Sequence, residues 1–179
     1  PELGGYGSIR APRRPYTEEV GRSPGKLRVG LMKTPAIPVP VHPECTAAVE
    51  NAAALCSSLG HEVEEVTLPI NAMEAYLAAG ALLFLNSNLS IHKREQQLGR
   101  KMTEGDLEPI NWARYQRYKN VSAQDVLAAR SLQVKVHWQI AEFMRNYDVI
   151  LSPTLPLMAA KVGEMGPKQP IEVVDKKAS

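Results

Sequence analysis

The hydrophobic and polar positions of this 179-residue chain follow two periods, which together predict a mixed α/β protein. Short apolar segments of strand length lie at residues 27–31, 62–67 and 147–152. Between the first two, apolar positions recur at three- and four-residue steps from Cys45 to Leu59, which is the period of a helix. A strand, a helix and a strand with short connections predict a βαβ unit. We therefore expect the first two strands to be parallel, either as neighbours or one strand apart.

Longer helical segments occupy the middle of the chain. One begins near Ala72 and is apolar on nearly every side as far as Leu85, which is typical of a core helix packed between other elements. It then becomes polar, and its basic stretch at residues 92–101, HKREQQLGRK, is interpreted as a solvated helical face. A second helix is expected over residues 107–120.

A last helix is expected from Ser122 to about Asn146, because Ser122 and Asp125 resemble a capping box. Its main apolar stripe faces the core. A second stripe indicates that one face needs another partner, and it consists of Leu127, Val134, Trp138 and Ala141. The predicted fold is α/β, a layered sheet with helices on both sides, a βαβ unit and long helices.

Composition and charge narrow the function classes. A hydrophobic content of 44% and a net charge of +2 with interleaved signs are those of an ordinary globular protein, without a broad field for nucleic acid. The longest apolar run, residues 75–85, is shorter than the roughly 20 residues of a membrane span, and we expect a cytoplasmic protein without membrane partners. We divide the chain into an extended arm at 1–26, an α/β portion at 27–165 and a tail at 166–179.

Metal and cofactor chemistry is not expected. His42 and Glu44 match only the beginning of a zinc deaminase signature, and the P-C-x-x-C that should follow is missing, so a helix N-terminus explains them better. The four histidines are scattered, and Cys45 and Cys56 lie about 16 Å apart along one helix, too far for a disulfide. We therefore predict no metal site and no cofactor.

Four residues are candidates for a substrate pocket. Asn86 and Asn88 stand where the apolar helix becomes polar and could bond an amide or carboxylate, although residues at a helix end often act as caps. Trp112 could wall an apolar cleft or pack in the core. Thr154 follows the third strand, where α/β sheets bind ligands, or it serves a turn.

Several consecutive segments resemble the amidase signature family. They are RPYTEEVGRSPGKLRVGL, VPVHPECTAAVENAAALCSSLGHEVEEVTLP, LEPINWARYQ, VSAQDVLAAR and YDVILSPTLP, in the order of that family's C-terminal half. The resemblance covers about residues 13–165 and is greatest to the small-molecule amidases. It implies a partial amidase signature fold and a small-molecule amide as substrate. The family also includes the A subunit of the tRNA-dependent amidotransferase.

The resemblance implies that an amide is cleaved by a serine nucleophile, a second serine in a cis peptide and a lysine base, all in the family's N-terminal half. The segment GSIRAP, with Ser8, is similar to the nucleophile's motif, but only seven residues precede Ser8 and none of them is Lys or Ser. We therefore expect Ser8 to be a decoy and this chain to hold no catalytic residue. An alternative is a stand-alone, non-catalytic α/β binding module.

A half of an amidase would leave apolar surface and a sheet edge uncovered. Such surfaces drive association, and we expect the chain to form a homo-oligomer, most simply a two-fold dimer.

Overall fold

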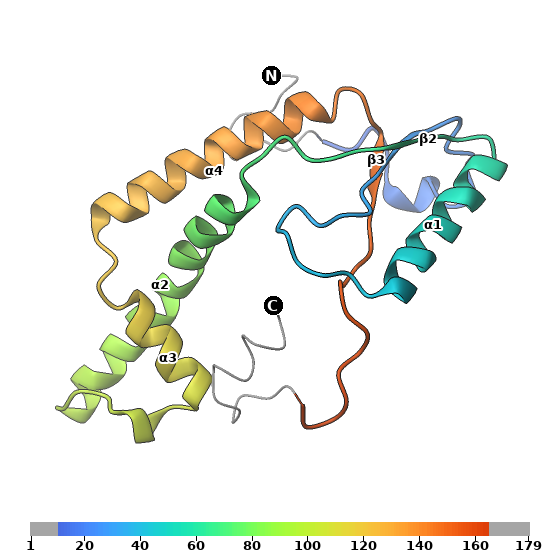
Figure 1. The fold of residues 1–179 in the computed structure, drawn as a ribbon. Helices are drawn as coiled ribbons and strands as arrows, with labels where there is room; N and C mark the ends of the chain where they lie inside the picture. Colours follow the sequence, from blue (N-terminus) through green and yellow to red (C-terminus); the bar gives the residue numbers. More distant parts are fainter. Residues whose placement is uncertain (1–10, 165–179) are drawn as a thin grey trace. The chain divides into compact units, whose positions relative to one another are not determined.

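The computed structural model describes residues 11–164, which form four α-helices and one three-stranded sheet (Figure 1). The mixed α/β fold predicted from the sequence is confirmed. In chain order, the strands and helices are β1 (Arg28–Leu31), α1 (Pro43–Ser58), β2 (Glu62–Glu65), α2 (Ala72–Leu98), α3 (Pro109–Tyr118), α4 (Ala123–Phe143) and β3 (Val149–Leu151). Short 3-10 helices cover Tyr16–Glu18 and Glu104–Asp106.

The sheet has the order β2-β1-β3, and both neighbours of β1 are parallel to it. Val29 of β1 is in register with Val63 of β2 and with Val149 of β3. The predicted parallel pairing of the first two strands is therefore confirmed, and they are direct neighbours. The central strand is also the most buried, since Val29, Gly30 and Leu31 are all buried.

Helix α1 has the start and end that its sequence predicts. The Nδ1 atom of His42 accepts a hydrogen bond from the Glu44 amide at 3.2 Å, and Pro43 occupies the first helical position, where its missing N–H costs no hydrogen bond. Gly60 follows the helix with a φ of 92°, a left-handed conformation that glycine adopts without steric cost. Both cysteines, predicted not to pair, are free thiols.

One face of the sheet packs against α1. Leu31 of β1 joins Val49 and Ala53 of the helix in a buried cluster, and the partly buried Val63 and Leu151 pack against it. The small Ala53 side chain lets the helix lie close to the strands. Burial of these apolar side chains is the main stabilising contribution in this part of the molecule.

The opposite face of the sheet is packed closely around Gly30. A Cβ atom at this position would lie 2.7 Å from Cδ1 of Ile150 and 3.0 Å from Cγ2 of Val66, so only glycine fits without displacing neighbours. The Tyr147 ring also lies here, and its hydroxyl donates to Oε2 of Glu64 at 3.1 Å. The pKa of Tyr147 is raised, first by desolvation and then by this hydrogen bond to a carboxylate.

The described chain divides into two compact units. The sheet unit consists of residues 11–71 and 134–158, with β1, β2, β3, α1 and the last part of α4. The helical unit consists of residues 72–133 and 159–164, with α2, α3 and the first part of α4. Among residues 11–164, every helix is too short or too polar to cross a bilayer.

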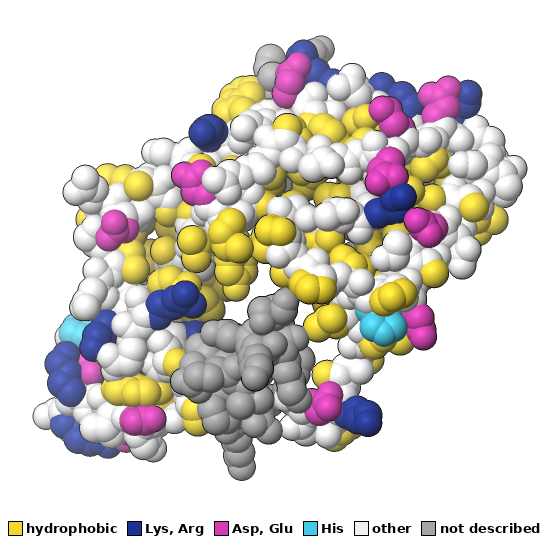
Figure 2. All heavy atoms as spheres, viewed as in Figure 1, with side chains coloured by type: hydrophobic (Ala, Val, Ile, Leu, Met, Phe, Trp, Pro, Cys, Tyr) yellow, Lys and Arg dark blue, Asp and Glu magenta, His cyan; other side chains and the backbone are white. Residues whose placement is uncertain are grey.

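Helix α2 corrects one expectation. It was predicted to be buried on nearly all sides, yet of its apolar residues only Ala72 is buried, while Tyr76 and Leu83 are 62% and 69% exposed. Hydrophobic side chains are visible along it in the space-filling view (Figure 2). The physical reason is that α3 packs against one side of α2, and an all-round apolar helix needs neighbours on every side.

The close packing at Gly30 gives the first testable prediction. We expect Gly30→Ala to lower the free energy of unfolding by about 1–3 kcal/mol relative to Gly105→Ala, because the added methyl group overpacks the sheet face. Both variants make the same change to the unfolded chain, and a Cβ at Gly105 meets nothing within 4 Å. Urea denaturation followed by circular dichroism measures the difference. Equal stabilities would show that the face has room for a side chain.

Candidate functional site

A cleft of about 320 Å³ lies between α2 and α3 in the helical unit. Its polar lining includes Ser87 and Asn88 from α2 and Asn111 and Arg114 from α3. The apolar lining includes Phe84, Ile91, Leu107 and Tyr115. An apolar cleft with a few convergent polar groups is the usual form of a small-molecule site.

Asn88 holds the two walls of this cleft together. Its Nδ2 atom donates to the backbone carbonyl of Tyr118 at 2.7 Å, which links α2 to the last residue of α3. The Oδ1 atom of the same side chain is buried and has no hydrogen-bond partner among the described residues. The amide orientation is fixed, because a backbone carbonyl can only accept. Gly80 lies on the same helix, about two turns before Asn88, and leaves room for the Tyr118 side chain. A Cβ atom at position 80 would lie 2.6 Å from the Tyr118 hydroxyl oxygen.

Arg114, Phe84 and Tyr118 form a stack beside the cleft. The rings of Phe84 and Tyr118 are 5.1 Å apart with an interplanar angle of 20°. The guanidinium carbon of Arg114 lies 5.2 Å from the centre of the Phe84 ring. A cation over an aromatic face is attracted by the ring quadrupole, so the stack fixes the position of the Arg114 charge.

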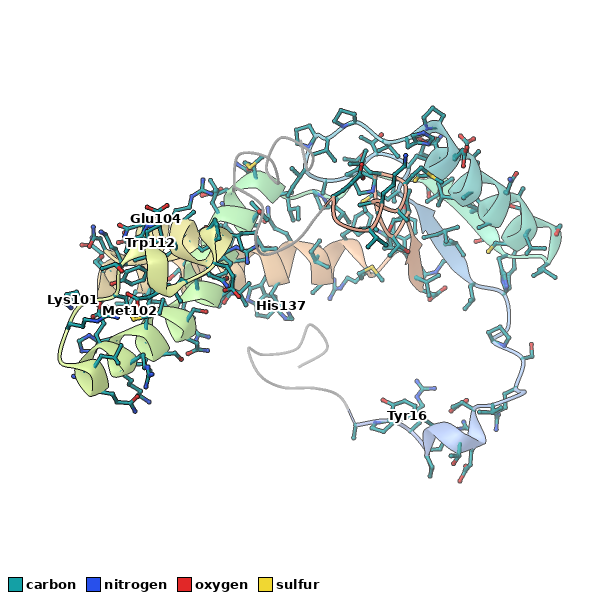
Figure 3. The ribbon with its side chains drawn as sticks, turned by 90° about the horizontal axis from the view of Figure 1, so that it is seen from below. Tyr16, Lys101, Met102, Glu104, Trp112 and His137 are labelled. Carbon is teal, nitrogen blue, oxygen red and sulfur yellow. The ribbon has the colours of Figure 1, made fainter. Side chains whose placement is uncertain are left out.

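A buried carboxylate fixes the end of α2. Glu95 is 6% exposed and accepts hydrogen bonds from Nζ of Lys101 at 2.7 Å and from the Met102 amide at 3.0 Å. Lys101 and Met102, labelled in Figure 3, belong to the segment that follows the helix. The Lys101 ammonium first, and then the Met102 amide, lower the pKa of Glu95. The solvated face expected for residues 92–101 is therefore wrong at Glu95, because a bound carboxylate is satisfied inside the protein.

The segment between α2 and α3 is held by a second carboxylate. Asp106 accepts from Nη1 and Nη2 of Arg100 at 2.8 and 2.7 Å, a bidentate pair, and from the amide and hydroxyl of Thr103, both at 2.8 Å. The Arg100 guanidinium first, and then Thr103, hold the pKa of Asp106 well below its usual range. This segment leads directly into α3 and so positions the Arg114 wall of the cleft.

A second groove, of about 340 Å³, lies in the sheet unit. Small side chains of α1, Cys45, Ala48 and Ala52, form one wall, and the segment after β3 forms the other. Thr154 lines this groove and is exposed. The backbone N–H of His42 donates to the carbonyl of Pro156 at 2.7 Å, which ties the start of α1 to that segment.

The structure places the four sequence candidates in different surroundings. Asn88 lines the cleft of the helical unit, and Thr154 lines the groove of the sheet unit. Asn86 is exposed, and its backbone carbonyl accepts from the Ser90 hydroxyl inside α2. Trp112 is half-buried on α3, and its ring lies 5.6 Å from that of Tyr115.

Sequence reasoning did not select Phe84, Arg114 or Glu95. Phe84 and Asn88 are four residues apart on α2, and such a spacing places two side chains on one helix face. That signal was available for Phe84. The placement of Arg114 over the ring depends on how α3 packs on α2, which no local pattern specifies. Within the described part of the chain, no three His, Cys, Asp or Glu side chains are grouped as metal ligands would be.

The sequence of this chain matches a protein family and individual relatives. The family model described as Amidase matches residues 6–177. The 6-aminohexanoate-cyclic-dimer hydrolase of Pseudomonas sp. (strain NK87) is 28% identical over 169 residues, 85% of this chain and 31% of the relative. The lipoamidase of Enterococcus faecalis is 27% identical over 128 residues, 69% of this chain and 17% of the relative.

Solved structures agree in fold. A 6-aminohexanoate cyclic dimer hydrolase complexed with substrate has a TM-score of 0.71 and 24% identity, over 91% of this chain and 35% of that chain. A bacterial aryl acylamidase has a TM-score of 0.64 and 21% identity, over 81% of this chain and 31% of that chain. The chain spans about a third of the length of the hydrolases it matches.

The hydrogen bond of Asn88 gives the second prediction. We expect the free energy of unfolding of Asn88→Ala to lie about 1 kcal/mol below that of Asn86→Ala, since only the former loses a part-buried hydrogen bond. Both substitutions remove an asparagine from α2, so the gain in helix propensity cancels. Thermal unfolding of the two variants measures the difference. Identical unfolding curves would contradict the role of Asn88 in joining α2 to α3.

Proposed function

This chain belongs to the amidase family, and on that premise we propose that it forms the C-terminal, substrate-pocket part of an enzyme that hydrolyses the C–N bond of carboxylic amides. The family match over residues 6–177 carries this proposal. Relatives that are named lipoamidase and amidase support the same reaction class. The share of 31% that the chain covers of a matched hydrolase supports a contribution from sequence outside these 179 residues.

The catalytic residues are proposed to lie in that other part. Resemblance to the amidase signature family implies a serine nucleophile, a bridging serine and a lysine base. The serine oxygen attacks the amide carbonyl carbon and its proton passes through the bridging serine to the lysine. The lysine then returns a proton to the leaving amine, and water hydrolyses the acyl-enzyme.

Two of the described lysines are poorly suited to the role of this base. A lysine base must be neutral to accept a proton, so a raised pKa is unfavourable for that role. The pKa of Lys33 is raised by the carboxylate of Glu65, and that of Lys101 is raised by Glu95. Both ammonium groups are therefore held in the charged form. Ser8 lies outside the described residues 11–164, and we retain it as a decoy on the sequence argument alone.

The described part is proposed to supply pocket walls. The cleft of the helical unit offers Asn88 and a fixed cation, and the groove of the sheet unit offers an apolar surface with Thr154 at its edge. Such walls bind and orient an amide for attack by a nucleophile supplied elsewhere.

The third prediction tests where the activity resides. We expect the 179-residue chain to hydrolyse acyl p-nitroanilides no faster than buffer, and the protein from the intact gene to hydrolyse at least one of a panel that differs in acyl chain. Release of p-nitroaniline measures both rates. Turnover by the 179-residue chain that is lost in Ser8→Ala would overturn the division. Inactivity of the intact-gene protein with amides of every class tested would favour the binding module.

We also propose that the chain self-associates through the second stripe of α4. Within this stripe Leu127 is 67% exposed and Trp138 is 44% exposed, while Val134 and Ala141 are half-buried. Exposed large apolar side chains at helical spacing favour a protein partner, and a second copy of the chain provides the same surface by two-fold symmetry.

The fourth prediction follows from this stripe. Light scattering coupled to size-exclusion chromatography should give the mass of a dimer for the chain and for Ala128→Glu. Trp138→Glu should be a monomer, because it places a charge in the apolar contact. Ala128 is exposed on the same helix and lies about 100° around the helix axis from Leu127, so its substitution makes the same change of net charge outside the stripe. A monomeric unmodified chain at high concentration would contradict the proposal.

A further inference from the structure

Arg114 stands out among the cations of the helical unit. It is half-buried on α3, it lies over the Phe84 ring, and it makes no hydrogen bond or ion pair with any residue between 11 and 164. Other arginines of the described chain are paired although they are more exposed: Arg28 with Asp148, and Arg100 with Asp106. A partly desolvated guanidinium without an anion keeps five N–H donors available.

The lining of the cleft shows what these donors would meet. None of the described residues that line it carries a carboxylate, and Arg114 supplies the cation of that lining. The nearby Asn111 side chain donates from Nδ2 to Glu108 at 2.8 Å, so that acid is engaged along α3. An anion that enters the cleft therefore meets a positive charge without a competing carboxylate in the lining.

The remaining lining is apolar or neutral. Ile91 and Leu107 contribute alkyl surface, and Ser87 contributes a hydroxyl. The volume of about 320 Å³ suits a small ligand and excludes a folded segment. These properties favour a carboxylate attached to a short alkyl chain over a free inorganic anion, since the alkyl chain gains from burial against apolar walls.

We propose that the α2–α3 cleft binds the carboxylate of a small organic acid through Arg114, with the acid's alkyl chain along Ile91 and Leu107. The guanidinium presents parallel N–H donors that match both carboxylate oxygens. Stacking on Phe84 holds it in place before the ligand arrives, which reduces the entropy lost on binding. The binding site is inferred from the cleft alone. That amide substrates of this protein carry the carboxylate is a second step, which rests on the proposed function.

The experiment is a calorimetric titration of the intact-gene protein with sodium hexanoate, with hexanamide as the neutral probe of similar shape. We expect hexanoate to bind and hexanamide to bind at least tenfold more weakly. Arg114→Met should raise the dissociation constant for hexanoate about 10–100-fold, the usual effect of losing charge-assisted hydrogen bonds. Arg117→Met removes an exposed charge of the same helix outside the cleft and should leave it unchanged.

Further arms separate binding from a merely structural role. Arg114→Lys keeps the charge without the planar fork and should bind hexanoate more weakly than the unmodified protein and more tightly than Arg114→Met. Inorganic phosphate should bind more weakly than hexanoate. No hexanoate binding, or equal losses in Arg114→Met and Arg117→Met, would overturn the site, as would equal binding of phosphate and hexanoate. The titration needs no turnover, so its failure is distinguishable from a failure of amide hydrolysis.

Discussion

The sheet unit depends on β1, because both other strands reach the sheet only through their hydrogen bonds to it. β2 follows about thirty residues later and β3 about 120 residues later, so one short strand joins distant parts of the chain.

An ion pair reinforces the connection between β1 and β3. Asp148, just before β3, accepts from the Arg28 amide at 2.8 Å and from its guanidinium at 3.1 Å. These hydrogen bonds lower the pKa of Asp148 and raise that of Arg28. The pair contributes stability above the unfolded-state pKa of Asp148 and loses it as the pH falls through the folded-state pKa.

The helical unit depends on two polar side chains of α2, although most of that helix is exposed. Asn88 joins α2 to α3, and Glu95 joins α2 to the segment that follows it. Because Asn88 ties α2 to α3 and Glu95 ties α2 to the segment leading into α3, the two helices lie where Phe84 and Arg114 can stack on each other. A cleft whose walls are fixed in this way can select a ligand by the position of one charge.

Local patterns predicted much of the fold and less of the site. The apolar positions around Val29, Val49 and Val63 recur with the spacing of a strand, a helix and a strand. The right-handed crossover rule limits how two such strands can pair, so the parallel β1–β2 pair could be predicted. The burial of Glu95 could not, because its partners Lys101 and Met102 follow a turn and only the folded segment brings them back. The exposure of α2 was mispredicted for a related reason. An apolar pattern indicates that a helix needs packing partners, but it does not indicate whether the chain supplies them.

We have proposed that these residues form the pocket walls of an amidase whose nucleophile lies elsewhere in the protein. A fluorophosphonate probe tests it directly, because it forms a covalent bond with the oxygen of an activated serine and with few others. The measurement is labelling of the protein from the intact gene, followed by mass spectrometry of its peptides. We predict one labelled serine, outside the 179 residues described by this sequence. Labelling of Ser8, or of any other serine within these 179 residues, would contradict the claim.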